Sequence, residues 1–232
     1  MSSRVNVQTS DGAMPAHLWL PETGSGPGLV LLQEIFGVSR YIQRRGADLA
    51  AAGYVVLAPE LYWRLDGARV DEGASDVVNQ AMALVSQLDW PVTVSDSAAA
   101  FAHLRGLEAV HDGAGVIGFC FGGGLGFNLA AVEEPDVLVS YYGSSIPELL
   151  DLAPQVTCPS LHHFGLADSY IDAETVATIQ ERVLATGVAL FETYPGADHA
   201  FDNSDFPLHD AEASALAWSR TLAFLAEQLP VR

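Results

Sequence analysis

Short and almost uninterrupted apolar segments recur along the chain, and segments with helical spacing lie between them. The apolar segments are GPGLVLLQ (26–33), YVVLAP (54–59), AGVIGF (114–119), VLVSYY (137–142), PSLHHFG (159–165) and VALFETYP (188–195). Such runs are typical of strands that are buried on both faces, as in a parallel sheet. This pattern restricts the chain to architectures in which helices cover both sides of a sheet.

The remaining segments supply the helices and two further strands. Apolar spacing predicts helices over 41–52, 76–88, 95–104, 121–132, 173–185 and 210–229, with Pro91 between the second and the third. Two short strands, 4–9 and 14–20, flank a Ser-Asp-Gly turn, and 60–72 is a loop. We therefore predict an α/β protein, a three-layer αβα sandwich with a mainly parallel sheet. No linker or repeat interrupts it, so we expect one domain over 1–232.

The charge of the chain limits its partners. The net charge is −19, and all ten basic residues are arginines. Such an acidic chain is not expected to bind nucleic acid or anionic membranes. No apolar run approaches the roughly 18 residues of a membrane span, and the polar start of the chain does not resemble a secretion signal. With only two cysteines, a cytoplasmic location is expected.

One of the two cysteines lies in a glycine-flanked turn. Gly118-Phe119-Cys120-Phe121-Gly122 joins the strand 114–119 to the helix 121–132. This is the G-x-nucleophile-x-G pattern with cysteine in the serine position. The helix N-terminus beyond Cys120 favours developing negative charge. The alternative is a glycine-rich turn with a small buried thiol. A nucleotide loop is disfavoured, because position 120 is not glycine and no GK[ST] follows.

A cysteine nucleophile needs a base and a group that orients the base. Asp168 follows the strand 159–165, and His199 follows the strand 188–195, in the acid-then-histidine order of this architecture. The carboxyl ends of parallel strands share one edge of the sheet, so we expect the three side chains to converge there. Taken singly, Asp168 also fits a helix cap or turn and His199 a loop position. Asp172 is the reserve acid.

Other titratable residues are interpreted as structural. His162 and His163 lie inside an apolar strand and are expected in the core, and Cys158 is expected to be buried. None of these has the spacing of a zinc site, so no metal is predicted. Asp198 and Asp202 flank His199 and are expected to be solvated. His17 is expected on the surface with no particular partner.

The chain resembles the dienelactone hydrolase family of α/β-hydrolases along nearly its whole length. The matching segments are QEIFGVSRYI (33–42), LAPELYWR (57–64), GFCFGGG (118–124), YYG (141–143), FGLAD (164–168) and GADHAF (196–201). The resemblance implies the α/β-hydrolase fold, with Cys120 as nucleophile, His199 as base and Asp168 as the group that holds the histidine. It also implies an oxyanion hole formed by the N–H groups of Ile35 and Phe121, and no cofactor.

The resemblance further implies a role for Glu34. A carboxylate beside a thiol in a poorly solvated site raises the pKa of the thiol, since two anions repel. Our hypothesis is that Glu34 keeps Cys120 protonated until substrate arrives and then accepts its proton. The alternative is that Glu34 braces its loop through backbone hydrogen bonds.

The chain departs from the family where arginines hold a substrate carboxylate. The family pattern H-S-F-x-R after the base is here His199-Ala200-Phe201-Asp202-Asn203, and no arginine lies between 70 and 103. A desolvated carboxylate without a cation is costly by several kcal/mol. The sequence therefore predicts a neutral or differently anchored substrate rather than dienelactone itself. Arg40, Arg64 and Arg69 are expected in exposed salt bridges.

The leading hypothesis is a cysteine-dependent hydrolase of a small ester or lactone that forms an acyl-enzyme and acts as a monomer. Phe36, Tyr62, Trp63 and Asn203 are the predicted substrate-binding residues. One alternative is a thioesterase or another acyl hydrolase with the same triad. The alternative of another class is a non-catalytic small-molecule binding protein that retains the fold.

Overall fold

The computed structural model describes residues 2–66 and 68–232. The strands are β1 (Ser3–Gln8), β2 (Ala13–Trp19), β3 (Gly26–Leu32), β4 (Val55–Pro59), β5 (Val110–Phe119), β6 (Leu138–Tyr141), β7 (Ser160–Gly165) and β8 (Ala189–Tyr194). The helices are α1 (Arg40–Ala51), α2 (Val77–Val85), α3 (Trp90–Arg105), α4 (Phe121–Glu133), the 3₁₀ helix η1 (Ile146–Gln155), α5 (Ala173–Leu184) and α6 (Ala211–Gln228). They form two compact units, one up to Ala114 with Val231–Arg232 and the other Gly115–Pro230.

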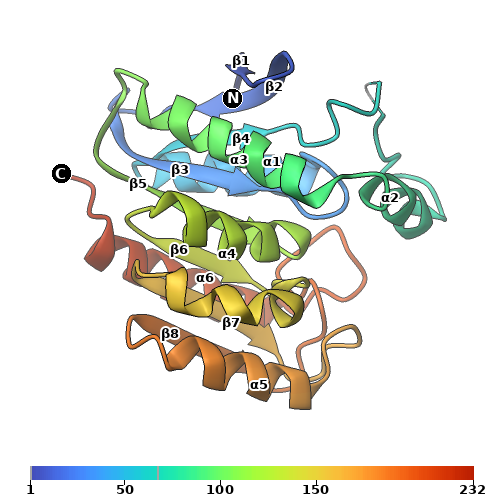
Figure 1. Cartoon of the computed structure of the whole chain (residues 1–232). Helices are drawn as coiled ribbons and strands as arrows, with labels where there is room; N and C mark the ends of the chain where they lie inside the picture. The colour runs from blue at the N-terminus through green and yellow to red at the C-terminus, as the bar shows by residue number, and fades with distance from the viewer. Residues whose placement is uncertain (1, 67) are drawn as a thin grey trace. The chain divides into compact units, whose positions relative to one another are not determined.

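The first unit contains β1 to β4 in the spatial order β1-β2-β4-β3, with helices on both faces (Figure 1). β2 runs antiparallel to both β1 and β4, whereas β3 and β4 are parallel. Glycines allow the helices to approach closely. A Cβ added to Gly28 would lie 3.0 Å from Leu104 on α3, and one added to Gly46 on α1 would lie 3.0 Å from Trp19.

The second unit contains β5 from Gly115 onward together with β6 to β8, all parallel and paired in chain order. α4 and α5 lie on one face of these strands and α6 on the other (Figure 1). Successive side chains alternate between the faces. The His162 ring meets Phe127 of α4 edge-on, and the next residue, His163, bonds Thr221 of α6.

Strand register brings the carboxyl ends of the second unit together. Phe119 is paired with Tyr141, and Tyr141 is paired with His163. Cys120 and Tyr142 are the next residues along β5 and β6. The loops that carry Asp168 and His199 leave β7 and β8 at the same edge of the sheet. This edge is where parallel sheets place ligand sites.

The predicted α/β class, with buried parallel strands and helices on both faces, is confirmed in each unit. Three local expectations were wrong. Helix α3 begins at Trp90, so Pro91 lies in its first turn, where a missing N–H costs nothing, and Asp89 caps it. β5 begins earlier, at Val110. The 3₁₀ helix η1 was not predicted, because prolines lie near both of its ends.

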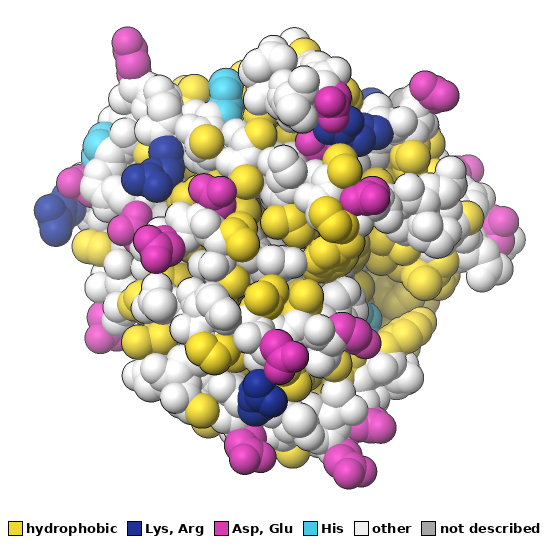
Figure 2. Space-filling model, viewed as in Figure 1, with side chains coloured by type: hydrophobic (Ala, Val, Ile, Leu, Met, Phe, Trp, Pro, Cys, Tyr) yellow, Lys and Arg dark blue, Asp and Glu magenta, His cyan; other side chains and the backbone are white. Residues whose placement is uncertain are grey.

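Acidic side chains are scattered over the visible surface, and basic ones are few (Figure 2). Arg40 and Arg69 pair with Glu72 and Glu60, as expected of exposed salt bridges. Arg64 differs, because one of its partners, Asp96, is buried. In the described part of the chain, no helix has both the length and the apolar character needed to cross a membrane.

Candidate active site

Cys120 sits at a strained turn between β5 and α4. It is the N-cap of α4, with φ +53° and ψ −117°, outside the conformations that a cysteine usually adopts. A Cβ at Gly118 would overlap the carbonyl oxygen of Gly122, so the turn requires glycine there. The Cys120 N–H donates to the carbonyl of Tyr141 at 2.9 Å, which ties the turn to β6. Strain held by such surroundings is characteristic of functional turns.

His199 lies between a thiol and a carboxylate. Its Nε2 is 3.1 Å from Cys120 Sγ, and its Nδ1 is 2.8 Å from Asp168 Oδ2. All three residues are buried. An ionised carboxylate can only accept, so Nδ1 carries a proton and Nε2 faces the sulfur. The three predicted residues are therefore brought together in the order thiol, imidazole, carboxylate.

The loop carboxylates fix this arrangement. Asp168 Oδ1 accepts from the N–H groups of Tyr170 and Ile171 at 2.8 and 2.9 Å, which leaves Oδ2 for the histidine. Asp198 Oδ1 accepts from the N–H of Ser169 at 2.7 Å and that of His199 at 2.6 Å. Asp198 therefore links the loop after β7 to the loop after β8, so that the acid and the base are positioned together.

The electrostatics favour a charged imidazole. Burial by itself lowers the pKa of His199, but the adjacent Cys120 and the hydrogen-bonded Asp168 outweigh burial and raise that pKa above its ordinary value. An imidazolium 3.1 Å from sulfur stabilises a thiolate, which is the nucleophilic form of cysteine. This arrangement is able to move a proton between sulfur and a leaving group.

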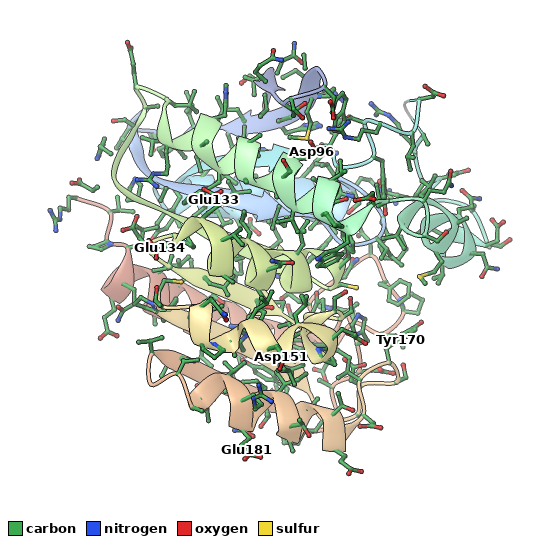
Figure 3. All side chains as sticks on the ribbon, in the orientation of Figure 1. Asp96, Glu133, Glu134, Asp151, Tyr170 and Glu181 are labelled. Carbon is green, nitrogen blue, oxygen red and sulfur yellow. The ribbon has the colours of Figure 1, made fainter. Side chains whose placement is uncertain are left out.

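Two tyrosine rings flank His199, and the sequence did not single them out. Tyr142 lies 5.2 Å from the imidazole and Tyr170 5.0 Å, the latter edge-on. Tyr170 projects from the loop after β7 and is 65% exposed (Figure 3). The available signal was position alone: Tyr142 follows a strand end and Tyr170 follows Asp168 by two residues.

The other predicted residues of the second unit have local partners. Phe121 is the first residue of α4, where N–H groups point out of the helix end. Asn203 is buried, and its Oδ1 accepts from Asp205 N at 2.9 Å. Asp172, the reserve acid, caps α5 by accepting from Thr175 N at 2.8 Å.

The predicted residues of the first unit come from the loops after β3 and β4. Glu34 is buried and forms an isolated bridge with Gly37. The Tyr62 hydroxyl donates to the Ile35 carbonyl at 2.6 Å. Phe36, Tyr62 and Trp63 line a cavity of about 340 Å³ in this unit. The Trp63 indole N–H donates to Asp96 Oδ2 at 2.8 Å.

The residues interpreted as structural are mostly where expected. His162 and His163 are fully enclosed, and burial lowers the pKa of His162 to about 3. Burial raises the pKa of Cys158 to about 11. Two expectations were wrong. Asp202 is 1% exposed and accepts from Ser214 Oγ at 2.7 Å, because α6 packs over it. His17 is also buried, with Glu60 as a partner at 3.1 Å.

Comparisons with known proteins identify the family of the chain. A family model described as the dienelactone hydrolase family matches residues 14–229. Carboxymethylenebutenolidase 1 of Cupriavidus pinatubonensis is 33% identical over 218 residues, which cover 94% of this chain and 93% of that protein. Carboxymethylenebutenolidase of Pseudomonas sp. (strain P51) is 34% identical over 222 residues, 95% of this chain and 92% of that one.

A solved structure shows the same architecture. The putative dienelactone hydrolase from Klebsiella pneumoniae has a TM-score of 0.85, 26% sequence identity, and a match that covers 98% of each chain. The match to the family model, the alignments with the curated relatives and the structural match each cover nearly the whole chain. The chain belongs to the dienelactone hydrolase family, a family of hydrolases with the α/β-hydrolase fold.

Proposed function

We propose that the protein is a cysteine-dependent hydrolase of a small ester or lactone. The observation that carries the proposal is the position of His199, 3.1 Å from the Cys120 sulfur and 2.8 Å from Asp168. Relatives named carboxymethylenebutenolidase support an oxygen ester or lactone as the bond that is cleaved. Cys120 is the nucleophile, His199 the general base and acid, and Asp168 the residue that orients the imidazole.

The proposed reaction has two halves. The Cys120 sulfur attacks the ester carbonyl while His199 Nε2 takes the thiol proton, and that proton then passes to the leaving alkoxide. The remaining thioester is attacked by water, whose proton His199 accepts and returns to the sulfur as the acid leaves. The N–H groups of Phe121 and Ile35 are the proposed donors to the oxyanion, an interaction of about 3 kcal/mol for each such donor in related sites.

The substrate proposed is neutral or anchored by groups other than the family arginines. Asn203 stands at the position of one such arginine, and its Oδ1 already accepts from its own loop. Phe36, Tyr62 and Trp63 are proposed to contact the substrate. The low cysteine content supports a cytoplasmic location for the proposed enzyme. A single domain over 1–232 and a monomeric state are further parts of the proposal.

Glu34 is proposed as a proton switch that keeps Cys120 protonated at rest and relays the thiol proton to His199 when substrate arrives. The support is the resemblance of QEIFG (33–37) to the family, together with the burial of Glu34. Alkylation of Cys120 by iodoacetamide across pH measures the effect. Glu34→Gln should shift the pH profile of alkylation, and Glu22→Gln, which removes an exposed carboxylate of the same unit, should not. Identical profiles would leave Glu34 as a loop brace.

The function is tested by a panel of p-nitrophenyl esters, lactones and thioesters, followed by mass spectrometry of the protein. We expect turnover and an acyl adduct on the peptide that contains Cys120. Cys120→Ala should abolish both, whereas Cys158→Ala, the matched control, should retain both. Preference for thioesters would favour the thioesterase alternative. No turnover and no adduct on any substrate would favour a binding protein.

A further inference from the structure

A polar cavity of the first unit lies outside the triad. Its volume is about 340 Å³, and side chains from β1, β2 and the loops after β3 and β4 line it. The polar residues that carry the inference are Arg4, His17, Gln33, Glu60 and Arg69. Cavities of this size are typical of sites for small ligands.

Glu60 is the centre of the charge cluster. Its Oε1 pairs with Arg4 and lies 3.1 Å from His17 Nε2, and its Oε2 lies 3.6 Å from Arg69. The carboxylate only accepts, so His17 donates through Nε2 and accepts from Ser2 Oγ through Nδ1. Burial, reinforced by Arg4, lowers the pKa of His17, which therefore adds little positive charge.

The cluster has an excess of positive charge in a chain whose net charge is −19. The guanidinium groups of Arg4 and Arg69 share the single carboxylate of Glu60. Glu72 also lines the cavity, but its carboxylate is paired with Arg40 at 3.3 Å. Each guanidinium has five N–H donors and uses only part of them on Glu60. One uncompensated positive charge with spare donors therefore faces the cavity.

Gln33 gives a second and independent sign of a ligand. It lines the cavity, is 1% exposed, and its Oε1 accepts from Leu61 N at 3.4 Å. Its amide nitrogen is buried and has no hydrogen-bond partner. An unsatisfied buried donor is unfavourable and calls for an acceptor. The unsatisfied group of Gln33 is a hydrogen-bond donor, and so are the unused N–H groups of Arg4 and Arg69.

We propose that this cavity is a binding site for a small organic monocarboxylate. The carboxylate oxygens would accept from the guanidinium groups of Arg4 and Arg69, and from the amide of Gln33. The remainder of the ligand would contact Val38 and Val70, apolar residues that line the same cavity. A neutral ligand would leave the charge uncompensated. A phosphate dianion would add more negative charge than the cluster can balance, with Glu60 among its neighbours.

Glu60 competes with the ligand for both guanidinium groups. Replacing Glu60 by glutamine removes a negative charge from the cavity but keeps the size of the side chain. Binding of a carboxylate should then become about tenfold tighter, since a like charge is removed next to the ligand. A purely structural ion pair would show no such gain.

The experiment is titration calorimetry of the full chain with benzoate, and with benzamide as the neutral analogue. We expect saturable binding of benzoate and none of benzamide. Arg4→Gln and Arg69→Gln should each weaken benzoate binding about tenfold, as loss of one charge-assisted hydrogen bond requires. Both side chains are more than half exposed, so both variants should fold. Arg182→Gln, an exposed arginine of the other unit, should change nothing.

Four results would overturn the proposal. The first two are the absence of saturable benzoate binding and equal binding of benzoate and benzamide. The third is binding that responds to Arg182→Gln as much as to Arg4→Gln and Arg69→Gln, and the fourth is preference for inorganic phosphate over benzoate. Gln33→Met tests the amide donor, with circular dichroism as the check of folding. If that variant unfolds, the arginine pair and Glu60→Gln decide the matter.

Discussion

Two histidines of the second unit, His199 and His163, are both buried, and each forms hydrogen bonds through both ring nitrogens. The partners of His199 are the acids Asp168 and Cys120, at 2.8 and 3.1 Å. The partners of His163 are hydroxyl groups, Tyr194 at 2.8 Å and Thr221 at 3.0 Å. The two residues have similar burial and similar numbers of partners, and they differ in the charge that those partners can carry.

That difference reverses the sign of the pKa shift. Burial lowers the pKa of His163, and His162 and Arg220 lower it further. At His199, burial also acts to lower the pKa, but Cys120 and Asp168 raise it above the ordinary value. A buried histidine is thus a structural hydrogen-bonding group when its partners are neutral and a proton carrier when they are acids. Partner chemistry, more than burial, separates the proposed base from the core histidine.

The largest difference between the two histidines is expected when each is replaced by asparagine. His199→Asn should lower kcat for an ester by about a thousandfold or more, because the base that serves the thiol is lost. Its fold, followed by circular dichroism, should be kept. His163→Asn is the matched control and should retain kcat to within about twofold, since the proposed mechanism does not use it. Equal losses in both variants would contradict the separation.

Asp168→Asn should have the next largest effect. The amide retains an acceptor for the N–H groups of Tyr170 and Ile171 but removes the charge that stabilises the imidazolium. We expect kcat to fall by about a hundredfold or more, with a smaller change in KM. Asp172→Asn removes the cap charge of α5 and should leave kcat unchanged. A large loss in Asp172→Asn instead would transfer the role to the reserve acid.

The sequence predicted much of this region because its signals are local. Cys120, Asp168 and His199 each follow an apolar segment, and parallel pairing brings strand ends together. The buried Asp202 and the pairing of His17 with Glu60 were missed, because both depend on packing between distant segments. Tyr170 was missed for a different reason: an exposed aromatic residue in a loop carries no periodic signal. Roles assigned to Glu34 and Ile35 rest on the resemblance, since a single carboxylate or N–H has no pattern.

The loss of stability at low pH gives a further test of this comparison, through His162, the neighbour of His163. Burial lowers the pKa of His162 to about 3 in the folded protein, below its ordinary value near 6.5. The unfolded chain therefore binds more protons between these values, and stability is lost as pH falls from about 6.5 towards 3. His162→Phe should remove this part of the acid sensitivity, on the order of 2 to 3 kcal/mol at pH 4, in urea unfolding against wild type.

The pKa shift of His199 has the opposite sign, so its contribution to stability changes with pH in the opposite direction. Its raised pKa contributes stability that is fully present below about pH 6.5 and is lost as pH rises through the folded value. His199→Asn should therefore lose stability relative to wild type mainly at low pH. A variant whose deficit grew with rising pH would contradict the direction of the shift.

His163→Asn should lower the free energy of unfolding by about 2 kcal/mol. The shorter asparagine side chain cannot reach both Tyr194 and Thr221, so at least one of these hydroxyl groups loses its hydrogen bond to position 163. Tyr141 also bonds Thr221, at 2.7 Å, so the loss should extend to the contact between β6 and α6. Urea unfolding at neutral pH measures it. An unchanged midpoint would mean that these hydroxyl groups find other partners.

The smallest effect is expected at Tyr170, whose ring meets the His199 imidazole edge-on at 5.0 Å and is otherwise largely exposed. An aromatic contact of this kind contributes about 1 kcal/mol, so Tyr170→Ala should lower kcat/KM about fivefold with little change in stability. Tyr170→Phe retains the ring and should retain the rate. If the phenylalanine variant lost as much as the alanine variant, the hydroxyl rather than the ring would be the group that serves the site. Tyr170 would then resemble Asp168 and Cys120, because it would act on His199 through an ionisable group and not as a neutral neighbour.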